Sequence, residues 1–232
     1  MSRTIIALDF SSRQEVLDFL KQFDRPVTVK IGMELVYGAG LDIVDEVKSM
    51  GHDVFLDLKL HDIPNTVKGG MKNLARRGAD IVNVHAAGGK RMMAAAIDGL
   101  KEGAEKRPLC IAVTQLTSTS QEAMNEEQGI PGDVIDSVLR YACCAKEAGL
   151  DGVVCSVHEA KAIKEACGAD FLTVTPGIRL ATDSVDDQKR VATPEFAKEQ
   201  GCDYIVVGRS ITKAADPKAT FEKIEEVMNG NV

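Results

Sequence analysis

The sequence predicts an α/β fold, a single-domain (β/α)8 TIM barrel that spans residues 1–232. Three observations predict it. Eight short runs rich in β-branched residues recur along the chain, helical patterns lie between them, and 232 residues is an ordinary size for one such barrel. A doubly wound open sheet is the alternative, but such a sheet usually has fewer strands, and no GxGxxG motif follows the first run.

The strand-like runs are nearly continuous in apolar character rather than alternating. That pattern is expected when both faces of a parallel sheet are covered, as they are in a barrel that is filled inside and surrounded by helices. In chain order, the predicted strands are residues 4–10, 27–32, 53–60, 81–88, 109–116, 152–157, 171–178 and 204–211.

Three of the helical patterns carry end signals; they cover residues 11–23, 66–78 and 131–149. Ser12 precedes the first apolar turn and is the expected N-cap. Gly78 and Gly149 stand where a glycine commonly ends a helix in the left-handed conformation. Pro131 is expected near the first turn of the third helix, a position that tolerates its missing N–H.

Two polar segments follow predicted strands. Residues 118–133 come after the fifth strand and are expected to form a loop with a short helix, and residues 179–190 come after the seventh strand and are expected to form a loop. Because both follow strands, both are expected at the C-terminal face of the barrel, where the active sites of such barrels form.

Composition excludes several classes of protein. The net charge is −7, and lysines and arginines are spread along the chain, which argues against a nucleic-acid-binding protein. No apolar run approaches the length of about 18 residues that a membrane span needs, and the N-terminal segment lacks a secretory signal. We therefore expect a cytoplasmic protein that does not interact with membranes.

Metal and redox sites are not indicated either. None of the six cysteines is spaced as CxxC, so free thiols are expected. His52 and His158 are expected on the surface near helix ends, and no group of histidines and carboxylates has metal-ligand spacing.

The third predicted strand ends in charge: residues 57–65 read DLKLHDIPN. Asp57 and Lys59 are two apart, which on an extended strand places both side chains on one face. Lys30, on the neighbouring strand, can approach Asp57, and Asp62 follows, so an array of alternating charge is expected inside the barrel end. Burying one charge without a partner is costly, so the array is either a reactive site or a salt-bridge network that closes the barrel.

Other polar or turn-forming residues lie at or just after the C-terminal ends of predicted strands, which is where barrels of this kind form their active sites. They are Asp9, Asn83, His85, Thr117, Pro176, Arg179, Gly208 and Arg209. The loops after strands seven and eight often bind phosphate in these barrels, and a Gly–Arg pair suits that task, since glycine admits a close backbone approach and arginine offers a fork of donors. The alternative is a tight turn with the arginine in solvent.

The stretch DLKLHDIPN, with VKIGMEL upstream and TPGIR and VVGRSI downstream, resembles the bacterial orotidine 5′-phosphate decarboxylase family. The resemblance covers essentially the whole chain. The Asp-x-Lys-x-x-Asp pattern marks a wider superfamily of barrels, and Lys30 in VKIG is specific to the decarboxylases. The resemblance implies conversion of orotidine 5′-phosphate to UMP in pyrimidine biosynthesis, without metal or cofactor, by a homodimer whose active sites lie at the interface.

The resemblance also implies roles for the charged residues. Lys59 is expected to donate a proton to the carbon that loses carbon dioxide, and Asp57 to lie against the substrate carboxylate and orient Lys59. Lys30 is expected to pair with Asp57. Both Lys30 and Asp9 are expected to reach the ribose.

Further roles follow for the rest of the site. Asp62 and Thr66 are expected to come from the partner subunit, Thr117 to contact the pyrimidine, and Gln188 to bridge base and phosphate. Pro176, Arg179, Gly208 and Arg209 complete the expected substrate-binding set, with Gly208 and Arg209 on the phosphate.

Three rival functions remain open from the residues. A magnesium-dependent sugar-phosphate decarboxylase or aldolase of the same superfamily would carry an acidic residue in place of Lys30, because a lysine there repels the metal. A non-catalytic nucleotide-binding barrel would not need Asp57 and Lys59 together. A Schiff-base lyase would need a neutral lysine in an apolar setting, whereas flanking carboxylates keep Lys59 charged.

Overall fold

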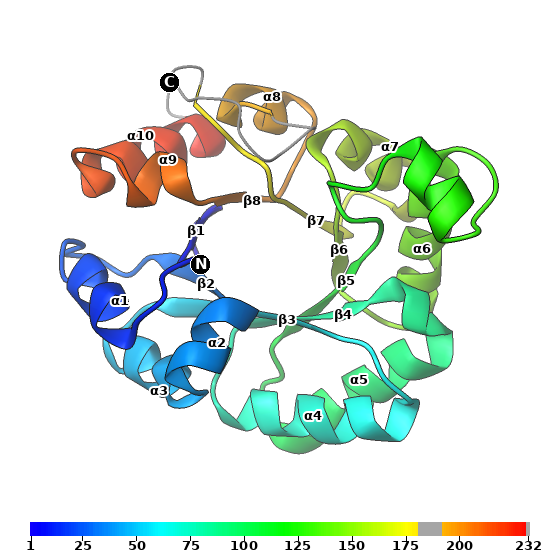
Figure 1. Ribbon diagram of the computed structural model, residues 1–232, viewed down its shortest axis with the longest axis horizontal. Helices are drawn as coiled ribbons and strands as arrows, with labels where there is room; N and C mark the ends of the chain where they lie inside the picture. The colour runs from blue at the N-terminus through cyan, green and yellow to red at the C-terminus, as the bar shows by residue number, and fades with distance from the viewer. Residues whose placement is uncertain (181–191, 231–232) are drawn as a thin grey trace.

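The computed structural model describes residues 1–180 and 192–230. Within them, eight parallel strands close into a barrel in chain order, each paired with its sequence neighbours and β1 paired with β8 (Figure 1). This confirms the predicted (β/α)8 barrel. The strands are β1 (Thr4–Ala7), β2 (Thr28–Gly32), β3 (Asp53–Leu60), β4 (Ile81–His85), β5 (Leu109–Val113), β6 (Gly152–Val154), β7 (Leu172–Thr175) and β8 (Tyr204–Val207).

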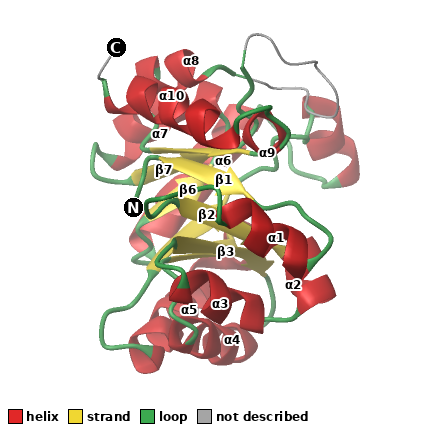
Figure 2. Ribbon diagram, turned by 90° about the vertical axis from the view of Figure 1, so that its left-hand side faces the viewer, coloured by secondary structure: helices red, strands yellow, loops and turns green. Residues whose placement is uncertain are grey.

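Helices surround the barrel on the outside, as the end-on view and the side view both show (Figures 1 and 2). They are α1 (Arg13–Leu20), α2 (Met33–Ala39), α3 (Asp42–Ser49), α4 (Pro64–Arg76), α5 (Gly89–Gly103), α6 (Val134–Glu147), α7 (Val157–Cys167), α8 (Pro194–Glu199), α9 (Arg209–Thr212) and α10 (Pro217–Asn229). A π-helical segment, Ala123–Glu127, is the short helix predicted after the fifth strand. In the described part of the chain, no helix has the length and apolarity to cross a membrane.

The strands are covered on both faces, which explains their continuous apolar character. Their outward side chains pack with the helices in one large cluster. Their inward side chains form a second, smaller cluster that plugs the barrel; its buried members are Ile5, Ala7, Phe55, Ile81, Ile111, Val174 and Val206. Several site residues, among them Asp57 and Asn83, lie two positions beyond a member of this plug, so the plug forms an apolar floor beneath them.

Most predicted strands extend too far, although the third, residues 53–60, is confirmed. The first ends at Ala7 rather than at residue 10, and the last ends at Val207 rather than at residue 211. Apolar residues continue past the ladder because the following turns are buried too: Leu8 and Ile211 are both fully buried, the latter in helix α9.

The predicted helix ends are partly right. Ser12 caps α1 in a reciprocal capping box with Glu15, and Gly78 and Gly149 both have positive φ just past a helix end, as expected. The helix predicted over 66–78 starts earlier, at Pro64, whose fixed φ suits the first turn. Pro131, by contrast, lies before the N-cap of α6 and outside its first turn.

Acidic side chains tie the strands together at the N-terminal end of the barrel. Asp80, Asp151 and Asp203 each stand directly before an even-numbered strand and accept a backbone N–H from the preceding odd-numbered strand, at 2.7 Å in each case. The donors are, in order, Val54, Cys110 and Thr173. Each carboxylate also pairs with a cation; these are Lys48, Arg107 and Lys164.

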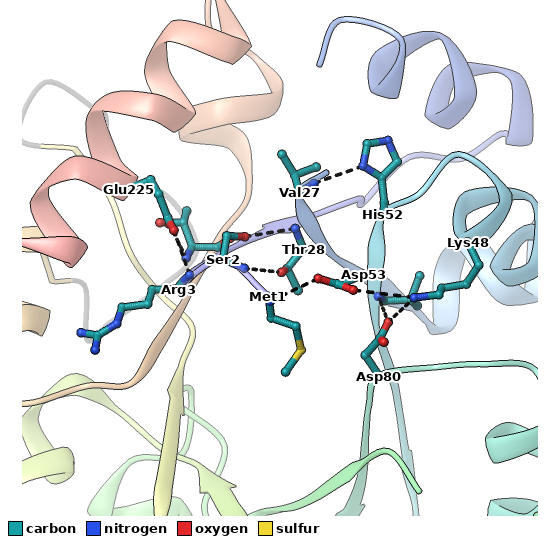
Figure 3. Close-up of polar contacts among 12 residues, drawn as sticks. Met1, Ser2, Arg3, Val27, Thr28, Lys48, His52, Asp53, Asp80 and Glu225 are labelled. Atoms are coloured by element: carbon teal, nitrogen blue, oxygen red, sulfur yellow. Dashed lines mark hydrogen bonds and ion pairs between the residues drawn. The ribbon is translucent and has the colours of Figure 1, made fainter. Parts of the chain in front are cut away.

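Two further groups complete this end, as Figure 3 shows. Glu225 accepts the backbone N–H groups of Arg3 and Thr4. His52, which was predicted to be a surface residue, is buried, and its Nδ1 accepts the N–H of Val27 at 3.2 Å. That prediction was wrong because the sequence around a single polar residue does not reveal which backbone N–H group it will accept in the fold. Burial lowers the pKa of His52, which favours the neutral, accepting imidazole.

Candidate active site

Two adjoining cavities open at the C-terminal end of the barrel. The first, of about 150 Å³, has an apolar floor that includes Phe55 and is lined above by Asp57, Lys59 and Thr117. The second, of about 240 Å³, lies beside it. The two share Lys30, Pro176 and Val206, so together they form one elongated site that could take a ligand with two chemically different ends.

The first cavity holds the predicted array of charge, with three of its four members. Lys59 Nζ lies 2.6 Å from Asp57 Oδ1, and Lys30 Nζ lies 3.7 Å from Asp57 Oδ2. Lys30 Nζ also lies 3.0 Å from Oδ1 of Asp9, whose side chain is largely exposed. Two carboxylates and two ammonium groups therefore alternate from the second cavity to the first, in the order Asp9, Lys30, Asp57 and Lys59.

Asp57 is ionised in this setting. Burial raises the pKa of its carboxyl group, but the nearby ammonium groups of Lys30 and Lys59 and the hydrogen bonds from Lys59 and Asn83 together outweigh that effect. The net result is a pKa below the ordinary value for aspartate. The two neighbouring cations thus keep this buried anion charged.

The backbone at Lys59 departs from the expected extended strand. Lys59 has φ of 52°, and among the described residues it is the one residue other than glycine with positive φ. The pairing of β3 with β4 shifts register between Leu56 and Leu60. Asp57 and Lys59 therefore meet through a bulge and not, as predicted, by simple alternation along a regular strand.

Asp62 does not join the array within one chain, so a four-membered array with Asp62 from a partner subunit stays a prediction. The strand ends at Leu60, and Asp62 is exposed in the following loop, where its Oδ1 accepts the N–H of its neighbour Ile63 at 2.6 Å. Thr66 is exposed in the first turn of α4.

The second cavity gathers residues from three strand ends. Asp9 follows β1, Arg179 follows β7, and Gly208 and Arg209 follow β8. Both arginines are half-buried and line this cavity. A Cβ on Gly208 would meet only Ala7 and Asp9, at 3.7 and 3.8 Å, so packing alone does not require glycine there. Its missing side chain leaves room in the cavity. Gln188 lies outside the described residues.

The structure identifies two residues of the site, Asn83 and Gln115, for which the sequence provides little or no indication. Asn83 was noted only as a polar residue late on a strand, yet its amide contacts both Asp57 and the backbone of Lys59. The signal was a polar residue two positions after the inward-facing Ile81. Gln115 was missed altogether; it lines the first cavity, and its Nε2 donates to Ser137 Oγ at 3.1 Å.

His85 borders the array without belonging to it. Burial lowers the pKa of His85, and neighbouring His61 and the Lys59 ammonium lower it further. The rings of His61 and His85 lie 5.7 Å apart between centroids. In the described part of the chain, no cluster of three or more His, Cys, Asp or Glu side chains is arranged to hold a metal ion.

A family model described as "Orotidine 5'-phosphate decarboxylase / HUMPS family" matches residues 2–224. The chain belongs to this family.

Individual members of the orotidine 5′-phosphate decarboxylase family resemble the chain over almost its full length. The orotidine 5′-phosphate decarboxylase of Lysinibacillus sphaericus is 58% identical, with 97% of this chain and 98% of the relative covered. That of Geobacillus kaustophilus is 59% identical, with 97% and 94% covered. The crystal structure of orotidine 5′-phosphate decarboxylase from Lactobacillus acidophilus has a TM-score of 0.90 at 44% identity and covers 99% of this chain and 100% of that one.

These findings confirm the resemblance inferred from DLKLHDIPN and its flanking motifs. The description of the family model carries two names, so the model alone does not separate the decarboxylases from their relatives. The curated relatives cited above carry the decarboxylase name, and this chain has the array of Lys30, Asp57 and Lys59 at the position where the fold forms its site.

Proposed function

We propose that this protein decarboxylates orotidine 5′-phosphate to UMP in pyrimidine biosynthesis, with neither metal nor cofactor. The observation that carries the proposal is the ionised Asp57 held between Lys30 and Lys59 on an apolar floor, beside a second cavity lined by two arginines. The high identity to named decarboxylases over 97% of the chain supports the choice of substrate.

The reaction needs a charge stabilised where the pyrimidine ring cannot delocalise it. The bond between the ring carbon and the carboxylate breaks, the electron pair stays on the carbon in the plane of the ring, and carbon dioxide leaves. Lys59 stabilises that developing charge with its ammonium group and then gives the carbon a proton. The neutral amine left behind recovers its proton from water.

Asp57 contributes in two ways of unequal size. It orients the Lys59 ammonium through the 2.6 Å contact, and it repels the substrate carboxylate. Two like charges about 4 Å apart repel by about 4 kcal/mol at an effective dielectric constant near 20. Enzymes lower barriers by roughly 8–23 kcal/mol, so this repulsion is a minor part of the effect. Stabilisation of the transition state by Lys59 is the larger part.

Binding energy from the far end of the substrate supports the chemistry. The phosphate occupies the second cavity, where Arg209 and the backbone at Gly208 bind it and Arg179 lies close by. The ribose lies between the two cavities, near Lys30, which lines both, and near Asp9, which lines the second. Pro176 and Thr117 contact the pyrimidine. Contacts with these non-reacting groups hold the carboxylate against Asp57.

The active enzyme is a homodimer in this proposal. Large apolar side chains are exposed on segments that follow strands β2, β3 and β5: Tyr37 is 78% exposed, Ile63 66%, Leu116 45% and Met33 41%. A second subunit that covers them would also bring its own Asp62 and Thr66 towards the site, which completes the array of charge. A cytoplasmic location is part of the same proposal, since the free cysteines suit a reducing compartment.

A hybrid dimer tests the shared site. Subunits with Lys59→Ala are mixed with subunits carrying Asp62→Ala, and each hybrid then has one site with both residues intact. Random mixing should restore about a quarter of the wild-type activity, because half of the dimers are hybrids with one of two sites working. A verified hybrid without activity would exclude a site completed by the partner's Asp62.

The activity itself is tested with orotidine 5′-phosphate in the presence of EDTA. Ultraviolet absorbance follows its conversion to UMP, with the Lys59→Ala variant as the matched control. Fast turnover by the wild-type protein but not by Lys59→Ala supports the proposal. Because EDTA is present, it also indicates that the reaction does not need an accessible metal ion. A folded protein that converts none of the substrate, but acts on a sugar phosphate once magnesium is added, would replace the proposal with the magnesium-dependent rival.

A further inference from the structure

The strand that carries the charged residues is bulged beside Asn83. Leu56 of β3 lies opposite Val82 of β4, and the next pair is Leu60 with Val84, so β3 advances four positions while β4 advances two. Asn83 is the residue of β4 between these pairs, and only 1% of it is exposed. Asp57 and Lys59 both lie inside the bulge.

The amide of Asn83 joins the two residues across the bulge. Its Oδ1 accepts the backbone N–H of Lys59 at 2.8 Å, and its Nδ2 donates to Asp57 Oδ1 at 2.7 Å. The same carboxylate oxygen also receives the Lys59 ammonium at 2.6 Å. One buried side chain thus fixes the backbone of the proposed proton donor and the carboxylate that orients it.

The chemistry of these partners determines which way the amide points. An ionised carboxylate can only accept, so the NH2 group must face Asp57, and a backbone N–H can only donate, so the oxygen must face Lys59. A flipped amide would place like dipoles against both partners. An aliphatic side chain of similar size would fill the space and serve neither partner.

The bulge needs such support because its backbone is strained. A residue other than glycine is strained in the left-handed region, and this conformation persists only where the surroundings enforce it. Lys59 has φ of 52°, and the ladder to β4 is interrupted next to it. The Asn83 oxygen occupies the place of the missing backbone acceptor.

We propose that Asn83 is a positioning residue for the reaction: it holds Lys59 in its left-handed conformation and Asp57 in the rotamer that places the Lys59 ammonium against the substrate. This inference rests on the proposed function. Asn83 acts through its two partners and is expected to lie behind them, away from the reacting carbon. A shift of about 1 Å in such a donor can lower a rate by about 100-fold.

The first test compares turnover with binding. Asn83→Ala should lower kcat by about 100-fold while KM and the Kd of UMP change by less than about threefold. Thr173→Val is the matched control: it removes a buried hydrogen bond to Asp203 at the other end of the barrel and should lower the free energy of unfolding with kcat unchanged. An Asn83→Ala enzyme with kcat within about threefold of wild type would overturn the proposal.

A second variant isolates the donor from the acceptor. Asn83→Asp keeps the acceptor for Lys59 but places a carboxylate against Asp57, so it should be as inactive as Asn83→Ala at neutral pH. Protonation of the introduced carboxyl restores a donor, and its protonation is favoured by the adjacent Asp57 charge. Its kcat should therefore rise as the pH falls, relative to that of Asn83→Ala, and parallel pH profiles of the two variants would rule out the donor role.

Other charged groups around this position set the background of that titration. They are Asp57 and Lys59 on β3, Lys30 on β2 and His85 on β4; Ile111, the residue of β5 in register with Asn83, is apolar. All are present in both variants, so the comparison of Asn83→Asp with Asn83→Ala cancels their own titrations.

A crystal structure of Asn83→Ala separates this inference from the proposed function. Loss of the positive φ at Lys59 and of the 2.6 Å contact with Asp57 supports the positioning role even if the wild-type protein leaves orotidine 5′-phosphate unchanged. An unaltered bulge with both features intact would contradict it, whatever the substrate proves to be.

Discussion

The two ends of the barrel carry similar charges and use them differently. At the N-terminal end, Asp80, Asp151 and Asp203 each accept a backbone N–H from a neighbouring strand and pair with one cation, so their partners all belong to the fold. Figure 3 shows this arrangement for Asp80 and Lys48. At the C-terminal end, Asp57 lies between two ammonium groups that border a cavity. Charge alone therefore does not mark a site; the difference is that the carboxylate at the C-terminal end has two ammonium partners that line the cavity, whereas each of the other three fastens the backbone of a strand.

Backbone strain separates the two ends as well. None of the aspartates of the N-terminal end has positive φ, whereas at the other end Lys59 is left-handed and β3 is bulged. Strain that persists in a folded protein is supported by its surroundings, and it gathers at functional positions. The difference indicates that the N-terminal end serves stability and the C-terminal end serves chemistry.

The largest expected effect comes from replacing one lysine at each end of the barrel and comparing the turnover of the two variants. Lys59→Ala should lower kcat by about 1,000-fold or more, because it removes both the proton donor and the charge that stabilises the carbanion. Binding of UMP should remain measurable. Lys48→Ala, which breaks ion pairs with Asp53 and Asp80 at the other end, should leave kcat unchanged. Steady-state kinetics checks both, and near-normal turnover by Lys59→Ala would remove it as the donor.

The arginines at the two ends give the next effect. Arg209→Ala should raise KM by roughly 10- to 100-fold, since a charge-assisted contact to phosphate contributes about 1.5–3 kcal/mol. Arg107→Ala removes a bidentate salt bridge with Asp151, with N–O distances of 2.7 and 2.9 Å. It should lower the midpoint temperature of thermal unfolding and leave KM unchanged. Equal KM values for Arg209→Ala and wild type would exclude Arg209 from the phosphate site.

The pH dependence of Asp57 sharpens the comparison. Its pKa in the folded protein is below the ordinary value of 3.8, so ionised Asp57 stabilises the fold above that pH, and this stabilisation is lost as the pH falls through the folded pKa. Carboxyl-carbon NMR should find the titration midpoint of Asp57 below 3.8 in the folded protein. A titration midpoint for Asp57 above that value in the folded protein would show that the two lysines do not hold its charge.

The smallest expected effect concerns His52. Burial lowers its pKa in the folded state below the ordinary 6.5, so the unfolded chain binds a proton first, and stability should fall as the pH drops from 6.5 towards the folded pKa. His52→Gln should reduce this slope and lower the free energy of unfolding by about 1 kcal/mol. Urea unfolding at pH 7 and 5.5 measures it; equal slopes for the two proteins would mean that His52 is not buried neutral.

Sequence patterns predicted the barrel and most of the residues around its cavities. Continuous apolar runs identify strands because both sheet faces are covered, but they do not reveal where the ladder stops, as Leu8 and Ile211 illustrate. The bulge at Lys59 could not be foreseen, since DLKL alternates like any regular strand and the left-handed turn depends on Asn83 from the next strand.

A sequence pattern that was not among the predictions marks the structural aspartates of the N-terminal end. Gly78, Gly149 and Gly201 stand two residues before Asp80, Asp151 and Asp203, respectively, so a Gly-x-Asp pattern ends directly before each of the strands β4, β6 and β8. The glycine ends a helix in the left-handed region, and the aspartate then meets the free N–H of the adjacent strand. Recognition of that repeat separates structural aspartates from Asp57.

The most direct measurement compares Asp57→Asn with Asp203→Asn. Both substitutions keep the size of the side chain and remove one charge from an ion pair, one at each end of the barrel. With folding confirmed for both, Asp57→Asn should lower kcat for orotidine 5′-phosphate by about 100-fold or more, and Asp203→Asn should leave kcat within about threefold of wild type while it lowers the free energy of unfolding. Equal kcat values for the two variants would contradict the division of the barrel into a reactive end and a structural end.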